Sequence, residues 1–185
     1  NTKSEITKQI TARLQWSVLN TKERIKLIEL RYYFLLDLLG SRTQMRISYL
    51  DYLQNGSESS LAKVKKITTD ALNSTKSFEI VHFYNLNKEH TTSVNSNRSF
   101  TVFKPELSLL PDEEKIKFLK TSDDLKVWLQ SPLILNNEVI GYIAVQSSGN
   151  EISILKEQNF GLGDTEELLL AYQDIDHPKF LLDVK

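Results

Sequence analysis

Hydrophobic and polar positions alternate in steps of three and four along the first fifty residues of the chain. Between Lys3 and Leu53 there is no proline, and Gly40 is the only glycine. This spacing is typical of a helix that packs lengthwise along one face. We therefore expect a long helix over residues 3–53 with one packing stripe, formed by Leu14, Val18, Thr21, Ile25, Ile28, Tyr32, Leu35 and Leu39.

Further apolar residues widen this face, so the middle of the helix must be covered on more than one side. They are Leu27, Leu30, Phe34, Leu36 and Leu38. The pattern predicts a parallel homodimer whose seam consists of Ile25, Ile28, Tyr32, Leu35 and Leu39. The alternative is that a second helix and a sheet cover this face within the monomer. Arg42 and Arg46 continue the stripe, which indicates either that the helix leaves the core there or that a salt bridge or an anion neutralises them.

The turn Gln54–Ser57 ends this helix, and a second amphipathic helix is predicted over residues 61–72. Residues 78–86 are rich in β-branched and aromatic side chains and predict a strand. Residues 91–99 are interpreted as an edge strand or an ordered loop. Pro111 and the acidic residues after it are typical of a helix start, and this predicted helix would bury Ile116, Phe118 and Leu119.

Two apolar runs, residues 133–135 and 139–145, flank Asn136-Asn137 and predict a β-hairpin, because asparagine tolerates the left-handed backbone of such turns. Gly141 marks a bulge or a close backbone approach. A short helix over residues 152–156 and a last hairpin, residues 168–172 with 180–182, complete the chain. The predicted class is α+β: a helical hairpin or stalk over residues 1–76 and an antiparallel sheet domain over residues 77–185, forming one structural unit.

Composition narrows the function classes. The 185 residues include 23 basic and 24 acidic side chains, so no strong field favours nucleic acid as a partner. The chain has no cysteine, which excludes disulfides and thiolate metal sites. No apolar run approaches the roughly 20 residues that span a bilayer. We expect the chain to be a segment taken from between two transmembrane spans that lie outside it.

Three segments carry a resemblance to a known family or to the helix ahead of its members. Residues 131–145, Ser-Pro-Leu-Ile-Leu-Asn-Asn-Glu-Val-Ile-Gly-Tyr-Ile-Ala-Val, resemble the central hairpin of the PAS-like Cache family. Residues 160–172 are similar to that family's Gly-Leu-Gly-x-Thr-Gly-Glu segment, although Glu166 stands where the family usually has glycine. Residues 41–53 resemble the long helix ahead of such domains in membrane-bound histidine kinases and diguanylate cyclases.

The resemblance implies a single Cache domain, a long helix and a second helix packed on a PAS-like antiparallel sheet. It also implies a non-catalytic, extracytoplasmic sensor of a bacterial inner-membrane receptor. Such a domain binds a small molecule and transmits a conformational change to an intracellular kinase or cyclase. Two alternatives stay open: a ligand-free interaction module that responds to a partner protein, and a hydrolytic enzyme.

In the resembling family the ligand lies over the sheet beneath a long loop. That position implies five ligand-binding candidates here, Arg98, Tyr84, His82, Trp128 and Tyr142. The guanidinium would bind a carboxylate and the aromatic rings would form walls. The three histidines lack helical metal-site spacing, and Gly161-x-Gly163 lacks the third glycine of a dinucleotide fingerprint. We expect no cofactor, no metal and no catalytic residue.

Overall fold

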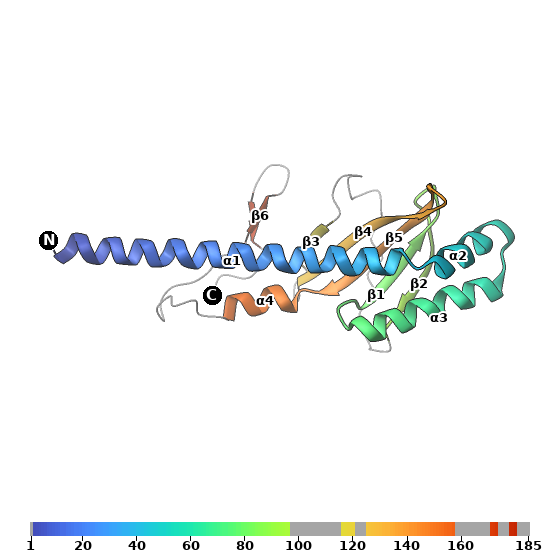
Figure 1. Ribbon diagram of the computed structural model, residues 1–185, viewed down its shortest axis with the longest axis horizontal. Coiled ribbons are helices and arrows are strands. Elements are labelled where there is room, and N and C mark those ends of the chain that lie inside the picture. The colour runs from blue at the N-terminus through green and yellow to red at the C-terminus, as the bar shows by residue number, and fades with distance from the viewer. Residues whose placement is uncertain (1, 97–115, 121–124, 158–170, 174–177, 181–185) are drawn as a thin grey trace.

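The structure, a computed structural model, describes residues 2–96, 116–120, 125–157, 171–173 and 178–180. Three helices come first along the chain, and all strands follow them (Figure 1). The helices are α1 (Thr2–Gly40), α2 (Thr43–Asn55), α3 (Glu58–Thr75) and α4 (Asn150–Glu157). The strands are β1 (Ile80–Tyr84), β2 (His90–Asn95), β3 (Ile116–Lys120), β4 (Leu125–Leu135), β5 (Glu138–Ser148), β6 (Ala171–Gln173) and β7 (Pro178–Phe180).

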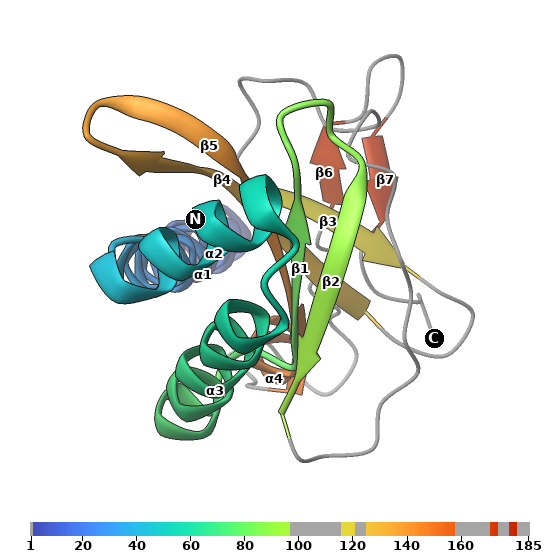
Figure 2. The same cartoon turned by 90° about the vertical axis from the view of Figure 1, so that its right-hand side faces the viewer.

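Five strands form one antiparallel sheet in the order β2-β1-β5-β4-β3, while β6 and β7 pair in a separate two-stranded sheet. The long strands β4 and β5 lie at the centre, and β1 pairs with β5 from Tyr84 opposite Tyr142 to Ile80 opposite Gln146. Helices α1, α2 and α3 all lie on one side of this sheet (Figure 2). This arrangement confirms the predicted α+β class.

The predicted helix over residues 3–53 is wrong at one point, because the chain breaks into α1 and α2 at residues 41–42. Arg42 has extended backbone angles, φ −64° and ψ 101°. Arg46 stabilises the break, since its guanidinium donates to the Ser41 carbonyl at 2.8 Å and also to the Ile134 carbonyl on β4. Neither arginine forms an ion pair within the described residues. Arg46 therefore joins two helices to the sheet through backbone oxygens.

The predicted dimer seam on α1 is instead part of the monomer's own core. Tyr32 and Leu39 are 1% and 4% exposed, and Ile25, Ile28 and Leu35 pack partly buried against the same cluster. The core lies between the helices and the sheet, so the sheet already occupies this helix face. A different set of apolar side chains on α1 is exposed, at spacings of three and four residues: Leu27, Leu30, Phe34 and Leu38. We call these four residues the exposed stripe.

The central hairpin is confirmed. Asn136 and Asn137 have φ values of 52° and 65°, the left-handed pair that a tight hairpin turn requires. Gly141 lies where β5 passes closest to its neighbours. A Cβ built at Gly141 would be 2.5 Å from the Tyr84 carbonyl oxygen and 3.1 Å from the Tyr49 ring, which confirms the expected close backbone approach.

Other predicted elements have mixed outcomes. Residues 90–95 form the edge strand β2, the short helix is present as α4, and β6 pairs with β7 within the predicted final hairpin. Residues 97–99, 168–170 and 181–182 of these predicted elements lie outside the described residues. The helix predicted after Pro111 is wrong over residues 116–120, which form β3 and pair with β4 from Ile116 opposite Leu129 to Lys120 opposite Leu125. Its predicted start, residues 111–115, lies outside the described residues. An apolar run this short has no clear period, so pairing with β4 decides its structure.

Candidate ligand-binding site

The two faces of the sheet differ in chemistry. Alternate residues of a strand point to opposite faces. On β1, Val81 and Phe83 belong to the apolar core beneath the helices, so His82 and Tyr84 belong to the opposite face, which we call the far face. On β5, Ile143 and Val145 likewise face the core. Polar and aromatic side chains therefore gather on the far face.

The far face carries a compact group of rings. The His82 ring centroid is 5.5 Å from the Trp128 ring at 31° and 6.5 Å from the Tyr84 ring. The His90 ring lies edge-on to Tyr84 at 5.5 Å and to His82 at 5.7 Å. Ala144 pairs with His82 in the register of β1 and β5, so the smallest side chain of this group lies beside the histidine. His82, Tyr84 and Trp128 are each at most 2% exposed.

A serine hydroxyl connects the two histidines of the far face. Ser93 Oγ lies 2.8 Å from His82 Nδ1 and 2.7 Å from His90 Nε2. A serine hydroxyl carries one proton, so it donates to at most one ring and accepts from at least one. The tautomers of the two imidazoles are therefore coupled through Ser93, and a proton gained by one ring changes the hydrogen bonding of the other.

A buried carboxylate lies at one end of the same face. Glu79, just before β1, is 7% exposed, and its Oε2 accepts from Gln146 Nε2 at 2.8 Å and from Lys126 Nζ at 3.3 Å. The ion pair with Lys126 compensates much of the cost of burying this charge. Gln146 Oε1 is buried and has no hydrogen-bond partner among the described residues. This amide oxygen is an acceptor that a ligand N–H or O–H would satisfy.

Burial fixes the protonation state of the tyrosine on this face. Removing the Tyr84 phenol from water disfavours its anion and raises its pKa to about 12 from the ordinary value of 10.0. At neutral pH Tyr84 is therefore a hydroxyl that both donates and accepts. The far face thus carries hydrogen-bond donors, acceptors and aromatic rings that are shielded from water.

Three of the five candidates from the sequence, His82, Tyr84 and Trp128, are brought together on the far face. Tyr142 packs beside them, half-buried, with Lys88 Nζ 5.9 Å from its ring centroid. Arg98 lies outside the described residues. Whether these residues bind a ligand stays a prediction.

Sequence reasoning missed His90, Ser93, Gln146 and Glu79. Gln146 follows Tyr142 and Ala144 at even spacing on β5, so strand alternation was a sufficient signal for it. Ser93 faces His82 only because of the β1–β2 register, which the sequence does not specify. Among the described residues, no group of three or more His, Asp or Glu side chains is arranged to hold a metal ion.

Comparison with known proteins gives no match to a family model, and no curated protein matches in sequence. Solved structures do match. The sensor domain of the V. cholerae histidine kinase DctB superposes with a TM-score of 0.61 at 14% identity, covering 78% of this chain and 58% of that one. The chain has the fold of a bacterial sensor domain.

Two further solved domains share this fold. One is the extracellular domain of the putative histidine kinase vpHK1S-Z8, with a TM-score of 0.51, 16% identity and coverage of 84% of this chain and 63% of that one. The other is the sensory domain of the Campylobacter jejuni chemoreceptor Tlp3 with isoleucine bound, with a TM-score of 0.52, 11% identity and coverage of 75% and 59%. Two of the three matches are thus sensor or sensory domains, and the third is an extracellular domain.

This chain spans less than two thirds of the length of each of the three matched chains. Among the helices that the structure describes, none combines the length and the apolar character needed to cross a bilayer.

Proposed function

We propose that this chain is the extracytoplasmic, ligand-binding sensor domain of a bacterial inner-membrane receptor, and that a small molecule binds on the far face of its sheet. The observation that carries the proposal is the buried group of His82, Tyr84, Trp128 and Gln146, in which polar atoms and rings converge opposite the helices. A buried sheet face with a purely structural role would be more stable if its side chains were apolar, because buried polar groups cost free energy unless they are paired. The domain itself is proposed to carry no catalytic activity.

The chemistry of the far face favours a small polar ligand with an apolar part. Trp128 and Tyr142 supply ring surface, while the Tyr84 hydroxyl and the Gln146 amide oxygen supply a donor and an acceptor. Arg98 is proposed as the partner of a ligand carboxylate. The isoleucine bound by the Tlp3 sensory domain combines these features, so amino acids are the first compounds to test, followed by organic acids and amines.

A thermal-shift screen with those three compound classes tests the proposal. A ligand present at 100 times its dissociation constant adds about 2.7 kcal/mol to the free energy of unfolding. For any hit, Ser93→Ala removes the hydroxyl that couples the two histidines, and we expect about five- to tenfold weaker binding by calorimetry. Ser131→Ala is the matched control, because this serine on β4 bonds only its neighbour's carbonyl, that of Pro132 at 3.3 Å.

The screen also separates the alternative function. If no compound raises the unfolding temperature, the ligand-free interaction module that responds to a partner protein becomes the better explanation. If a hit binds equally well to the wild type and to Ser93→Ala, the ligand does not depend on the far face.

We further propose that the receptor is a homodimer joined through α1, with the exposed stripe as the contact. Leu27, Leu30 and Phe34 are 65%, 63% and 67% exposed, unusually open for large apolar side chains. A second copy would bury them at the three- and four-residue spacing that parallel helices require. Ligand affinity that differs between two arrangements of this helix pair would shift the output of an intracellular kinase or cyclase.

A further inference from the structure

A second cleft lies away from the far-face aromatic group, at the end of the sheet where α3 stops and α4 begins. Its volume is about 330 Å³, within the range of small-molecule pockets. Its walls come from the last turn of α3, the segment entering β1, the residue after β2 and the residues that join β5 to α4. Five of its lining residues are uncharged and polar: Asn73, Ser77, Ser96, Ser148 and Asn150.

The hydroxyl of Ser96 is the least satisfied polar group in this cleft. Ser96 is 7% exposed, and its Oγ is buried without a hydrogen-bond partner in the part of the chain that the structure describes. Its backbone N–H donates to the Glu79 carbonyl at 2.8 Å, which holds the residue in place. A buried hydroxyl without a partner costs free energy that a bound hydroxyl would recover.

The two charged residues that line the cleft are already paired or solvated, so they do not require a charged ligand. Glu79 lines it, but its carboxylate is already paired with Lys126 at 3.3 Å and bonded by Gln146 at 2.8 Å. Lys76 also lines it, and its side chain is exposed, where water solvates the ammonium. Serine hydroxyls and asparagine amides both donate and accept, as does every hydroxyl of a polyol. Phe78 supplies the one aromatic surface of the lining.

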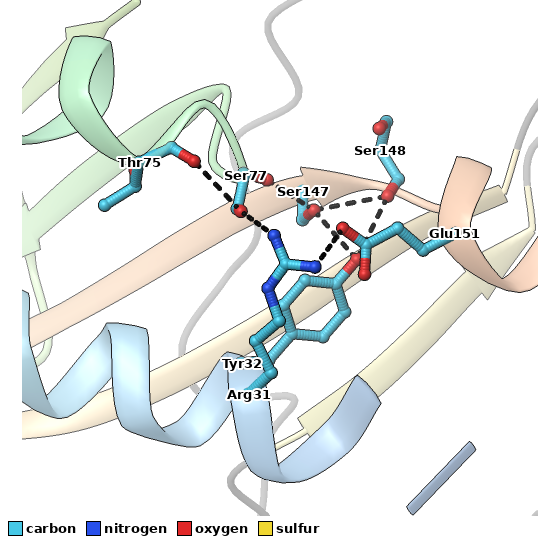
Figure 3. Close-up of polar contacts among 7 residues, drawn as sticks. All are labelled: Arg31, Tyr32, Thr75, Ser77, Ser147, Ser148 and Glu151. Atoms are coloured by element: carbon cyan, nitrogen blue, oxygen red, sulfur yellow. Dashed lines mark hydrogen bonds and ion pairs between the residues drawn. The ribbon is translucent and has the colours of Figure 1, made fainter. Parts of the chain in front are cut away.

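Two lining residues also belong to the polar cluster that holds α1 on the sheet (Figure 3). Ser77 Oγ accepts from Arg31 at 3.2 Å, and the Ser77 carbonyl accepts from Ser147 Oγ at 2.6 Å. The Ser148 carbonyl accepts from the same Ser147 hydroxyl at 3.2 Å and from the Tyr32 hydroxyl at 3.5 Å. Any molecule that bonds Ser77 or Ser148 from the cleft side therefore touches the contacts of Arg31 and Tyr32.

We propose that this cleft is a second ligand site for a small neutral polyol, such as a monosaccharide or a cyclitol, and that its occupancy is transmitted to α1. The assignment rests on the five uncharged polar residues that line the cleft, one of which, Ser96, has a buried hydroxyl without a partner among the described residues. The cleft meets the far face at Glu79 but none of the far-face rings line it, and the proposal does not depend on ligand binding at the far face.

Titration calorimetry with D-glucose, D-galactose, D-ribose and myo-inositol tests the assignment on the whole chain. We expect saturable binding of at least one compound. Ser96→Ala should weaken that binding about three- to tenfold, as expected for one neutral hydrogen bond. Ser74→Ala is the matched control, because Ser74 lies on the same last turn of α3 and bonds the Ala71 carbonyl at 2.8 Å. Its binding should equal that of the wild type.

Three results would overturn the proposal: no saturable binding of any polyol, unchanged affinity in Ser96→Ala, or binding lost in Ser93→Ala but kept in Ser96→Ala. The last result would move the polyol to the far face, and so separates this site from the proposed sensor site. Coupling to α1 is read by hydrogen exchange, where polyol should slow exchange of the amides around Tyr32. Unchanged exchange there, with binding intact, would refute the coupling.

Discussion

At Gly141 the backbone of β5 leaves no space for a side chain. Replacement by alanine would place a Cβ 2.5 Å from the Tyr84 carbonyl oxygen, so β1 and β5 must shift apart. We expect Gly141→Ala to lower the free energy of unfolding by about 1–3 kcal/mol, as other overpacking changes do. Urea denaturation measures this loss. Gly40→Ala is the control, since its nearest contact is a side-chain carbon at 3.6 Å, and it should not destabilise the domain.

The buried Tyr84 makes stability depend on alkaline pH. Its folded pKa of about 12 exceeds the ordinary value of 10.0, so the folded state keeps a proton that the unfolded state releases. This stabilising contribution is complete below pH 10 and is lost as pH rises from 10 towards 12. Tyr84→Phe should make the decline of unfolding free energy over that range shallower, while the buried Tyr49, whose pKa is also raised to about 12, keeps part of it. An equally steep decline in this variant would show that Tyr84 does not contribute to it.

Single residues were predictable from the sequence where local geometry decides their role. Asn136, Asn137 and Gly141 were identified correctly, because turn and close-approach positions restrict the residue type by themselves. His82, Tyr84 and Trp128 could be proposed from their strands, but Ser93 and Glu79 join them only through strand register and tertiary packing. The alternation of side chains within one strand predicts which residues share a face. Which strands pair, and in which register, is known only from the three-dimensional structure.

Helix α1 has two apolar faces with different predicted partners, and cysteines distinguish them because the chain has none of its own. In the proposed membrane-bound receptor, Leu30→Cys and Phe34→Cys should form disulfide dimers under mild oxidation. Ile28→Cys and Leu35→Cys should not, since both side chains pack against the monomer core. A disulfide requires Cα atoms within about 7 Å, so the reaction reports close contact. Crosslinking at Ile28 with none at Leu30 would reject the exposed stripe.

At the level of elements, the sequence predicted where helices and strands occur better than where the helices end or which strands pair. The α1–α2 break follows Gly40, a residue type that often ends helices, but the bond from Arg46 to the Ile134 carbonyl, 88 positions away, has no local signal. Strand β3 was misassigned as a helix because its stability comes from pairing with β4. Which face of α1 is buried likewise depends on where the sheet lies, and the spacing of apolar residues alone suits either face.

The first third of α1 contributes little to the free energy of unfolding of the whole molecule. Every side chain from Ser4 to Trp16 is exposed, and Ser17 is the first buried residue. Deleting residues 1–13 should therefore change the free energy of unfolding by less than about 0.5 kcal/mol, the range of surface changes. Deleting residues 1–40 removes Tyr32, Leu36 and Leu39 from the core and should prevent cooperative unfolding altogether. Circular dichroism during urea titration measures both, and a large loss from the shorter deletion would contradict the prediction.

The uninterrupted length of α1 also makes it a lever. Thr2 and Ser17, the residue at which burial begins, lie on one helix, and at 1.5 Å per residue they are about 22 Å apart. If the helix tilts by about 5° where it meets the core, its free end moves by about 2 Å, a displacement comparable to the helix shifts by which proteins switch state. A small rearrangement within the sheet, which leaves the strand pairing unchanged, would thus produce a larger displacement at the N-terminus of α1.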